Sequence, residues 1–496
     1  MRKTLEQLCA DALLRSADQP AVEFDGNRTT WGQMHRVAEL VQQLLKESGA
    51  ADSASVTFVP RNRPSALATL LALMAEGRHI RMLYPFQSAS SLARQIEQQK
   101  PPVVIAAARD FSPEVIAAMR AGGSAGIVID EMDAHLVESC EHSTVMAPVA
   151  PVSRQIDILT SGTTGTPKQF PVSYDMIAKF MVGEKLLSGE PYDCSNDPAT
   201  LLYFPIGNIT GIHTTVPALI KGQRIVLLDR FSLEQWHDFI VRFRPPMSGI
   251  PPTAMGQLLD ANIPAEDLSS LKSMGSGAAP LDPVLHKAFE QRYGIPILLS
   301  YGATEFGGPV TAMTIDDHRR WGDEKFGSVG RAFPGFQLRV VDPDSGEPLP
   351  EGQEGVLEVI SPRIGSDWIR TSDIALIDSD GFLFLKGRAD GAIMRGGFKV
   401  LPETIERALL LHPAVAAASV VAVPDERVNE VPGAAVQCKP GIDPPDEKEL
   451  EAHLREHLLA THIPVHWRFV SALPKTPSFK IDRPAVRRLF LPVIQS

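Results

Sequence analysis

The sequence predicts an α/β fold, and three observations predict it. Short apolar runs with the length of buried strands alternate with helix-like stretches through about residue 325. From there to about residue 389 short strands follow one another with only turns between them, which is typical of a small β-rich unit. From residue 390 to residue 496 helices and strands mix again over the length of a separate domain. Alternating strands and helices favour mostly parallel sheets with helices on their faces.

The predicted elements can be placed in order along the chain. Apolar residues at helical spacing predict helices over residues 32–47, 64–76 and 88–99, and apolar runs predict buried strands over 54–60 and 101–108. In the rest of the body we predict strands over residues 199–205 and 222–229 and a helix over 233–243. In the β-rich segment we predict strands within residues 326–342, 354–361 and 381–388. In the tail we predict helices over residues 401–413 and 446–460 and strands over 416–425, 432–440 and 465–474. We therefore expect an N-terminal body of residues 1–389, β-rich over about 325–389, and a C-terminal domain of residues 390–496.

Composition and charge exclude several classes of protein. The chain of 496 residues has a formal net charge of −11, and an acidic protein lacks the positive surface that binds nucleic acid or anionic lipid. The longest apolar run, residues 66–75, is about half as long as a bilayer requires, so we predict no membrane span. The first residues lack the uninterrupted apolar segment of a signal peptide, and we expect a cytoplasmic protein.

The cysteines predict neither a disulfide framework nor a metal site. Cys9, Cys140, Cys194 and Cys438 are scattered, without paired spacing, which fits reduced thiols in a cytoplasm. No HExxH motif or cluster of histidine and cysteine occurs, so we predict no transition-metal site.

A loop rich in hydroxyl groups and glycine is the strongest chemical signal. The run TSGTTGTPK, Thr160 to Lys168, packs five hydroxyl residues, two glycines and a lysine into nine positions. Glycines let backbone N–H groups close around phosphate oxygens, the hydroxyls add donors, and Lys168 adds positive charge. Pro167 stands where the common P-loop motif needs glycine, so the loop is of another kind. The alternative is a plain surface loop of turn-forming residues.

A second run, SYGATEFGG, combines an aromatic ring, a hydroxyl and a carboxylate. It extends from Ser300 to Gly308 after a strand-like stretch. The Tyr301 ring can stack on a purine, Thr304 can donate to a phosphate, and Glu305 can hold Mg²⁺, which prefers oxygen ligands and substrate phosphates. The alternative is a turn with a solvated glutamate.

A third pair of runs carries a carboxylate and a guanidinium. RTSD ends at Asp373, and GRAD extends from Gly387 to Asp390. Asp373 can accept both hydroxyl groups of a ribose, and Arg388 can reach the same sugar or a phosphate through charge-assisted bonds. The alternative is two surface turns joined by a salt bridge.

The order of these motifs resembles that of the adenylate-forming superfamily, which includes acyl-CoA synthetases, the adenylation domains of peptide synthetases, and luciferases. TSGTTGTPK, YGATE, TSD, GRAD, GGFKV and PKTPSFK follow one another in register, and TTWGQM and PRNRP near the start also fit. The resemblance covers essentially the whole chain and is strongest to the acyl-CoA synthetases. It implies a large body of two α/β subdomains plus a β-rich subdomain, followed by a small mobile α+β domain with Asp390 at the hinge.

The resemblance implies a reaction in two halves. A carboxylate first attacks the α-phosphate of ATP, which gives an acyl-adenylate and pyrophosphate. The C-terminal domain then rotates, and the thiol of coenzyme A displaces AMP. The implied cofactors and cosubstrates are ATP, Mg²⁺ and coenzyme A.

The resemblance also implies roles for individual residues. For the nucleotide these are Thr160, Ser161, Gly162, Thr163, Thr164, Gly165 and Lys168 at the phosphates, Gly277, Ala278, Ala279, Tyr301 and Gly302 at the adenine, and Asp373 and Arg388 at the ribose. Thr304 would touch the α-phosphate, Glu305 would hold Mg²⁺, and Lys480 would bridge the substrate carboxylate and the α-phosphate. Gly396, Gly397 and Lys399 would border the tunnel for the thiol arm.

Several positions depart from the family pattern. In PIGNITG, Pro205 to Gly211, a glycine replaces the usual aromatic and an asparagine the usual histidine, so we expect a wider or reshaped acyl pocket. The predicted acyl pocket consists of Gly207, Asn208, His213, Gly307 and Gly308, and the alternative for His213 is a packed or solvated histidine without a role in the pocket. TSD replaces the common TGD, Gly391 replaces the second acid of a GRxDD pattern, and Phe479 replaces the glycine before Lys480. The run from Tyr203 to Gly211 has no aspartate to pair a substrate ammonium, which argues against an amino-acid substrate.

The sequence thus predicts an AMP-forming acid–thiol ligase acting on a small carboxylic acid, with a slight preference for an aromatic or bulky one. One alternative keeps the adenylation and transfers the acyl group to an amine or to a separate acyl carrier protein. Another is a degenerate nucleotide-binding protein without chemistry, against which the intact Lys168, Glu305 and Lys480 argue. The sequence leaves open whether the protein is a monomer or a homodimer.

Overall fold

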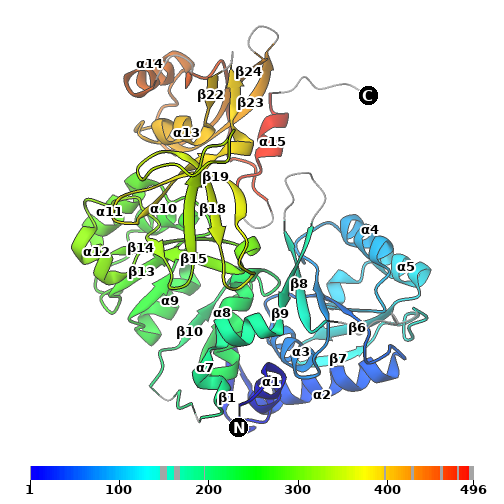
Figure 1. Cartoon of the computed structure of the whole chain (residues 1–496). Helices are drawn as coiled ribbons and strands as arrows, with labels where there is room; N and C mark the ends of the chain where they lie inside the picture. Colours follow the sequence, from blue (N-terminus) through cyan, green and yellow to red (C-terminus); the bar gives the residue numbers. More distant parts are fainter. Residues whose placement is uncertain are drawn as a thin grey trace. The chain divides into compact units, whose positions relative to one another are not determined.

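The structure is a computed structural model, which describes residues 2–145, 153–160, 168–190, 192–194, 196–395, 398–425, 429–458, 462–476 and 480–490. The chain forms two compact units (Figure 1). The first consists of Met1–Ser248, Glu266–Leu271 and Ala303–Gly308, and the second of Gly249–Ala265, Lys272–Gly302 and Pro309–Ser496. Among the described residues, no helix combines the length and the apolar character needed to cross a membrane.

A seven-stranded sheet forms the centre of the first unit. Its strand order is β7-β6-β5-β3-β4-β8-β9, with parallel pairs at the centre and antiparallel pairs at both edges. The strands are β3 (Val56–Val59), β4 (Ile80–Met82), β5 (Val103–Ala106), β6 (Ala125–Asp130), β7 (Asp133–Leu136), β8 (Gln155–Thr160) and β9 (Lys168–Ser173). Continuous apolar runs are what parallel strands covered on both faces require.

Helices cover both faces of this sheet. Successive strand residues point to opposite faces: Val103 and Ile105 pack with α1 to α3, whereas Val104 and Ala106 pack with α4 and α5. The helices are α1 (Leu5–Leu13), α2 (Trp31–Glu47), α3 (Pro64–Ala75), α4 (Ala89–Gln99) and α5 (Pro113–Gly122), with a 3₁₀ turn at Ala108–Asp110. The apolar run at 66–75 lies inside α3, which is buried all round, so this run belongs to the core. The early helices and strands predicted from the sequence are confirmed.

A second, four-stranded sheet in the first unit has the order β10-β11-β1-β2. Its strands are β1 (Pro20–Phe24), β2 (Asn27–Thr30), β10 (Thr200–Leu202) and β11 (Ile225–Leu227). The neighbouring helical segments are α6 (Tyr174–Met176), the π-helical stretch Ile177–Val182, α7 (Glu184–Leu187), α8 (Ile209–Lys221) and α9 (Leu233–Phe243). Parallel pairing of β1 with β11 brings the start of the chain beside the segment that precedes α9.

A five-stranded sheet, β12-β13-β14-β15-β16, carries the run that contains Tyr301. Its strands are β12 (Met247–Gly249), β13 (Ser273–Ser276), β14 (Ile297–Ala303), β15 (Gly308–Ala312) and β16 (Arg331–Ala332), and the helices are α10 (Pro252–Asp260), α11 (Pro283–Tyr293) and α12 (Ile315–Trp321). The antiparallel β-rich sheet follows, with β17 (Gln337–Val341), β18 (Gly355–Ile360), β19 (Ile369–Ile377) and β20 (Leu383–Arg388). The predicted β-rich strands are therefore present.

The C-terminal segment builds a sheet and core of its own. The strand order is β22-β21-β24-β23, and β25 also pairs with β24. The elements are β21 (Ile393–Arg395), β22 (Phe398–Val400), α13 (Pro402–Leu410), β23 (Val415–Asp425), β24 (Asn429–Cys438), α14 (Glu447–His457), β25 (His466–Phe469) and α15 (Arg483–Arg488), with a 3₁₀ turn at Ala389–Gly391. Helices α13 and α14 pack on one face of the sheet, and Val486 of α15 packs with residues of the other face. The predicted fold class is confirmed, and the domain boundaries at 389 and 390 stay predictions.

Candidate active site

Three residues predicted to contact the nucleotide come together in the second unit. The hydroxyl group of Tyr301 donates a hydrogen bond to Oδ2 of Asp373. Nη1 of Arg388 lies 3.7 Å from Oδ1 of the same carboxylate. The side chain of Asp373 is 19% exposed and that of Arg388 is 48% exposed, so the carboxylate is largely buried and the guanidinium reaches solvent. A carboxylate flanked by a hydroxyl and a guanidinium can bind neighbouring hydroxyl groups of a sugar.

The β-rich sheet explains the position of this cluster. In the antiparallel pair of β19 and β20, Asp373 lies opposite Arg388, so TSD and GRAD face each other on adjacent strands. The backbone N–H of Asp373 donates to Oγ1 of Thr371 over 2.9 Å. Nη2 of Arg388 donates to Oγ of Ser372. The serine that replaces the family's glycine thus contacts the predicted ribose-binding arginine, which the sequence did not predict.

The run after β13 lies directly beside the run that contains Tyr301. Parallel pairing sets Ser276 opposite Leu299, and a Cβ atom at Gly277 would lie 2.5 Å from Oγ of Ser300. Only glycine fits this close approach. Ala278 follows with φ of 65°, a left-handed conformation that is rare for a residue with a side chain and is often found at binding sites. The chain between Gly277 and Ala279 is thus fixed next to the end of β14.

Thr304 and Glu305 begin a short 3₁₀ helix directly after β14. The helix spans Thr304–Phe306 and ends at Gly307, whose N–H donates to the carbonyl oxygen of Thr304 over 2.9 Å. Gly307 has φ of 71°, which favours glycine. The side chain of Phe306 is buried and that of Glu305 is exposed, so the glutamate is accessible to a ligand from solvent.

His213 fastens this turn from helix α8. Its Nε2 lies 2.8 Å from the carbonyl oxygen of Gly307, and because a carbonyl only accepts, Nε2 carries the hydrogen. A Cβ atom at Gly308 would lie 2.4 Å from Nε2 of the same ring. Gly308 is therefore packed against His213, and a side chain in that direction would overlap the imidazole.

Gly207 and Asn208 each make a local contact that accounts for the residue type at that position. Asn208 caps α8, and its side chain accepts from the N–H of Gly211 over 2.7 Å. A Cβ atom at Gly207 would lie 3.3 Å from Cγ of Pro60. We expected the small residue at 207 to widen or reshape an acyl pocket, and this stays a prediction; the structure adds only that Pro60 lies beside the glycine. The pocket roles of these residues remain predictions.

The PRNRP run, residues 60–64, contacts the segment that precedes α8. Asn62 is 2% exposed, and its Nδ2 donates to the carbonyl oxygens of Phe204 and Leu228 over 3.1 and 3.0 Å. Its Oδ1 accepts from the N–H of Ile206 over 3.2 Å. No role was predicted for Asn62, although its position shortly after a buried strand is the signal that could have identified it. A satisfied buried amide of this kind fixes the entry to α8.

Several predicted site residues lie at the limit of what the structure describes. Ser161, Gly162, Thr163, Thr164, Gly165, Gly396, Gly397 and Phe479 lie outside the described residues. For Thr160, Lys168, Asp390 and Lys399 only the backbone is described: Thr160 ends β8, Lys168 begins β9, Asp390 lies in the 3₁₀ turn Ala389–Gly391, and Lys399 lies in β22. Thr160 and Lys168 are directly paired, so the loop that was predicted to bind phosphates connects two adjacent antiparallel strands.

Lys480 is an exposed residue of a turn with fixed ends. The N–H of Thr476 donates to the carbonyl oxygen of Lys480 over 2.7 Å, and the N–H of Asp482 donates to that of Pro474 over 2.9 Å. Lys475 and Ile481 form an antiparallel bridge. The backbone of residues 474–476 is thereby paired with that of residues 480–482, and these two segments are called the turn of Lys480.

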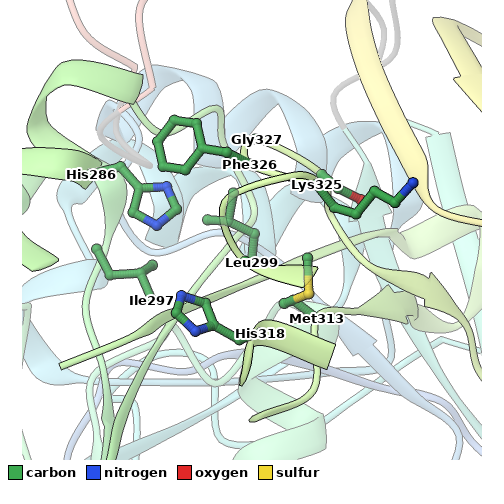
Figure 2. A pocket seen from close by; sticks show the side chains of 10 residues that line it. His286, Ile297, Leu299, Met313, His318, Lys325, Phe326 and Gly327 are labelled. Carbon is green, nitrogen blue, oxygen red and sulfur yellow. The ribbon is translucent and has the colours of Figure 1, made fainter. Parts of the chain in front are cut away.

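Two cavities of the second unit are not lined by the predicted site residues. Figure 2 shows a cavity of about 10 Å³, into which His286 and His318 point beside Ile297 and Leu299 of β14. A volume of this size holds at most one water molecule. A wider hollow of about 410 Å³ lies nearby, between Lys272 and Arg319.

Glu290 connects the helices around these cavities to β14. Its Oε1 accepts from Nε2 of His318 over 2.9 Å and from the N–H of Ile297 over 2.7 Å, and lies 3.2 Å from Nε2 of His286. Burial alone would raise the pKa of Glu290, but these hydrogen bonds outweigh burial and lower it. The ionised glutamate therefore holds the start of β14, four residues before Tyr301, to α11 and α12.

The described residues contain no group of three or more histidine, cysteine, aspartate or glutamate side chains arranged to hold a metal ion. Mg²⁺ is commonly bound through one or two carboxylates and substrate phosphates, which requires no such group.

Comparisons with known proteins show what the chain as a whole is similar to. The chain is 27% identical to "4-coumarate--CoA ligase-like 9" of Arabidopsis thaliana over 92% of its length and 84% of that protein's. It is 26% identical to a sulfoacetate–CoA ligase of Cupriavidus necator, with 97% of each chain covered. The structure of the amide bond synthetase McbA of Marinactinospora thermotolerans is similar, with 26% identity, a TM-score of 0.78, and 98% of this chain and 100% of that one covered.

Two family models match the chain. The model described as AMP-binding enzyme matches residues 9–366, and the model of the AMP-binding enzyme C-terminal domain matches residues 404–480. The first match alone covers well over half of the chain and includes Tyr301, Thr304 and Glu305. The chain therefore belongs to the family of AMP-binding enzymes.

Proposed function

We propose that this protein uses ATP to activate a carboxylic acid as an acyl-adenylate and then transfers the acyl group to the thiol of coenzyme A. The observation that carries the proposal is the cluster of Tyr301, Asp373 and Arg388 in a chain of the AMP-binding family. Three motifs contribute to this cluster. Asp373 supplies a carboxylate that accepts hydrogen bonds, and Tyr301 and Arg388 place a hydroxyl group and a guanidinium beside it. Such a set of polar groups is suited to binding a nucleoside.

The nucleoside half of ATP fits the described residues. Asp373 would accept the ribose hydroxyl groups, and Arg388 would assist from the opposite strand. The ring of Tyr301 and the chain at Gly277, Ala278 and Ala279 would enclose the adenine, with Gly302 beside them. The left-handed conformation of Ala278 supports a binding role for this run, because strained backbone is retained where it shapes a site.

The phosphates would be held by the loop from Thr160 to Lys168 and by Thr304. Glu305 would supply a carboxylate to a Mg²⁺ ion that arrives with ATP. The exposed position of Glu305 and the fixed turn that carries it support this assignment. Mg²⁺ supplies positive charge to the phosphate oxygens when bound, and the protein's own part is to orient those oxygens.

Lys480 would supply the charge that adenylation needs. Two anions, the substrate carboxylate and the α-phosphate, must meet, and positioned positive charge lowers the cost of their approach. The exposed lysine at the base of a closed turn can serve this purpose in one orientation of a C-terminal domain that begins at residue 390, with Asp390 as its hinge. Withdrawal of the same turn would then admit the thiol arm beside Gly396, Gly397 and Lys399.

The acceptor and the acid are the open parts of the proposal. Relatives named as CoA ligases at 26–27% identity support a thiol acceptor. The similarity to an amide bond synthetase supports, as a second candidate, transfer to an amine. One relative's name contains 4-coumarate, which supports an aromatic acid, and the other's contains sulfoacetate, which supports a small one.

A panel of carboxylic acids tests the proposal. Pyrophosphate release from ATP is measured for each acid alone, with coenzyme A, and with a set of primary amines. We expect release that depends on the acid and a thioester product in the presence of coenzyme A. An amide product without thioester would transfer the assignment to the second candidate. Absence of pyrophosphate release with every acid would overturn the adenylation itself.

A further inference from the structure

A group of charged side chains outside the predicted nucleotide site anchors the turn that carries Lys480. Arg483, the first residue of α15, reaches across the edge of the C-terminal sheet to helix α13. Its Nη2 lies 2.9 and 3.1 Å from the two carboxylate oxygens of Glu406, and 3.0 Å from Oε1 of Glu403. The exposed fractions of these side chains are 34% for Arg483, 14% for Glu406 and 18% for Glu403, so the group is shielded from water.

The same group closes the edge of strand β23 at Val420. The N–H of Val420 donates to Oε1 of Glu406 over 2.8 Å, and its carbonyl oxygen accepts from Nη1 of Arg483 over 3.4 Å. An edge strand leaves such groups unpaired, and here Glu406 satisfies the N–H while Arg483 satisfies the carbonyl oxygen. Arg483 and Glu406 therefore hold α15 and α13, which lie on opposite faces of the sheet, to one point of the edge strand.

This anchor is continuous with the turn of Lys480. Only two residues separate Arg483 from Lys480, and Asp482 between them caps α15 by accepting from the N–H of Ala485 over 2.9 Å. Asp482 also closes the turn through its hydrogen bond to Pro474. A shift of Arg483 would therefore displace the backbone of Lys480 by a similar distance.

The anchor also reaches the segment in which the hinge is predicted. A Cβ atom at Gly391 would lie 3.9 Å from Nη1 of Arg483, and one at Gly387 would lie 2.6 Å from Oε2 of Glu403. The glycine of GRAD thus lies against the glutamate that holds Arg483. Two motifs of the sequence, GRAD and PKTPSFK, are connected through one arginine and one glutamate.

We propose that Arg483 is a positioning residue for Lys480: its hydrogen bonds to Glu406 and its contact with Glu403 fix the turn of Lys480 relative to α13. The inference rests on the proposed function for its catalytic consequence only. Where the anchor is intact, Lys480 moves together with α13 when the C-terminal domain moves. Where it is lost, Lys480 remains present but is no longer held at one place.

The test compares Arg483→Gln and Arg483→Lys with Arg487→Gln in the full-length protein. Arg487 is an exposed residue of the same helix and makes a matched control. Hydrogen–deuterium exchange of the peptide that contains Thr476 to Asp482 reads the turn directly, whether or not the protein is active. We expect faster exchange there in Arg483→Gln, an intermediate rate in Arg483→Lys, and the wild-type rate in Arg487→Gln. Unchanged exchange in folded Arg483→Gln overturns the proposal.

The kinetics of adenylation provide the second measurement. We expect kcat for adenylation to fall about tenfold to a hundredfold in Arg483→Gln, as displacement of a positioned group by about 1 Å does, while KM for ATP changes by less than about threefold. In a Lys480→Ala background the same substitution should have no further effect, because Arg483 acts through Lys480. A full additional loss in that background would overturn the positioning role.

Two further arms keep the outcomes distinct. Should Arg483→Gln fail to fold, Arg483→Lys and Glu406→Gln carry the same comparison, with faster exchange of the turn expected in both and unchanged exchange contradicting the proposal. Should the wild-type protein release no pyrophosphate with any acid, the proposed function fails, and the exchange experiment still decides whether Arg483 holds the turn.

Discussion

The hydroxyl group of Tyr301 donates a hydrogen bond to the carboxylate of Asp373, although the two residues lie 72 positions apart in the sequence. One belongs to β14 of the five-stranded sheet and the other to β19 of the β-rich sheet. The contact brings two separate motifs into one cluster and gives the first test of the site.

Tyr301→Phe removes this hydroxyl group and keeps the ring. Asp373 loses a donor, and a hydrogen bond to a charged group is worth about 1.5–3 kcal/mol. If the cluster binds the ribose of ATP, KM for ATP should rise about tenfold or more, with a smaller change in kcat. The control is Tyr293→Phe, which removes a hydroxyl bonded to the carbonyl oxygen of Ile263 in the same unit. Equal KM values in the two variants would contradict a nucleotide role for the cluster.

Lys480→Ala should abolish most of the adenylation while ATP binding persists. Loss of one preorganised charge at a reacting phosphate typically costs on the order of 10²–10³ in rate. Pyrophosphate exchange measures the first half-reaction, and equilibrium binding measures the affinity for ATP. Lys475→Ala, an exposed lysine of the same turn, is the matched control. Near-normal pyrophosphate exchange in Lys480→Ala would show that the lysine has no role in adenylation.

His213 should act on catalysis through the turn that carries Thr304 and Glu305. His213→Phe keeps a ring and removes the Nε2–H that donates to Gly307, whereas His213→Gln places an amide N–H at a similar reach. We expect kcat for adenylation to fall about tenfold in the phenylalanine variant, with partial recovery in the glutamine variant. The same loss in both variants would instead indicate that the imidazole itself contacts the substrate.

The stability of the protein should depend on pH through Glu406. Burial raises its pKa from 4.5 to about 7, although Arg483 beside it acts in the opposite direction and Glu403 adds to the rise. The folded protein therefore keeps this proton to higher pH than the unfolded chain, so the stabilisation is fully present below about pH 4.5 and is lost as pH rises through about 7. The loss amounts to about 3 kcal/mol over that window.

Denaturant unfolding at several pH values between 4.5 and 8 measures this dependence. The Glu406→Gln variant has no titrating group at this position, so its unfolding free energy should fall less steeply than that of the wild type across the window. Parallel curves for the two proteins would exclude Glu406 as the titrating group.

Gly387→Ala should loosen the turn of Lys480 from a distance. The added Cβ would lie 2.6 Å from Oε2 of Glu403 and would displace this carboxylate from Arg483. Gly391→Ala is the control, because the nearest atom to its Cβ is 3.9 Å away. We expect faster hydrogen exchange around Lys480 in Gly387→Ala only. Equal exchange in both variants would show that the glycine of GRAD does not influence the turn of Lys480.

Much of the candidate site could be predicted because its residues belong to short motifs. TSD contains Asp373, GRAD contains Arg388, and the run YGATE contains Tyr301 and Glu305. At Gly207 we expected a wider or reshaped pocket, and the structure adds that a Cβ atom there would lie 3.3 Å from Cγ of Pro60. A glycine in a sequence reveals a missing side chain, but only the fold reveals what fills the space.

The sequence by itself determined the alternation of helices and strands, the existence of the β-rich and C-terminal segments, and the chemistry of the motifs, because periodicity and residue type are local properties. Only the tertiary structure decided that Ser372 contacts Arg388, that His213 holds Gly307, and that Arg483 joins the lysine turn to Glu403 and Glu406. These contacts depend on strand register and on which elements cross the edge of a sheet, and such long-range pairings leave no periodic signal in the chain.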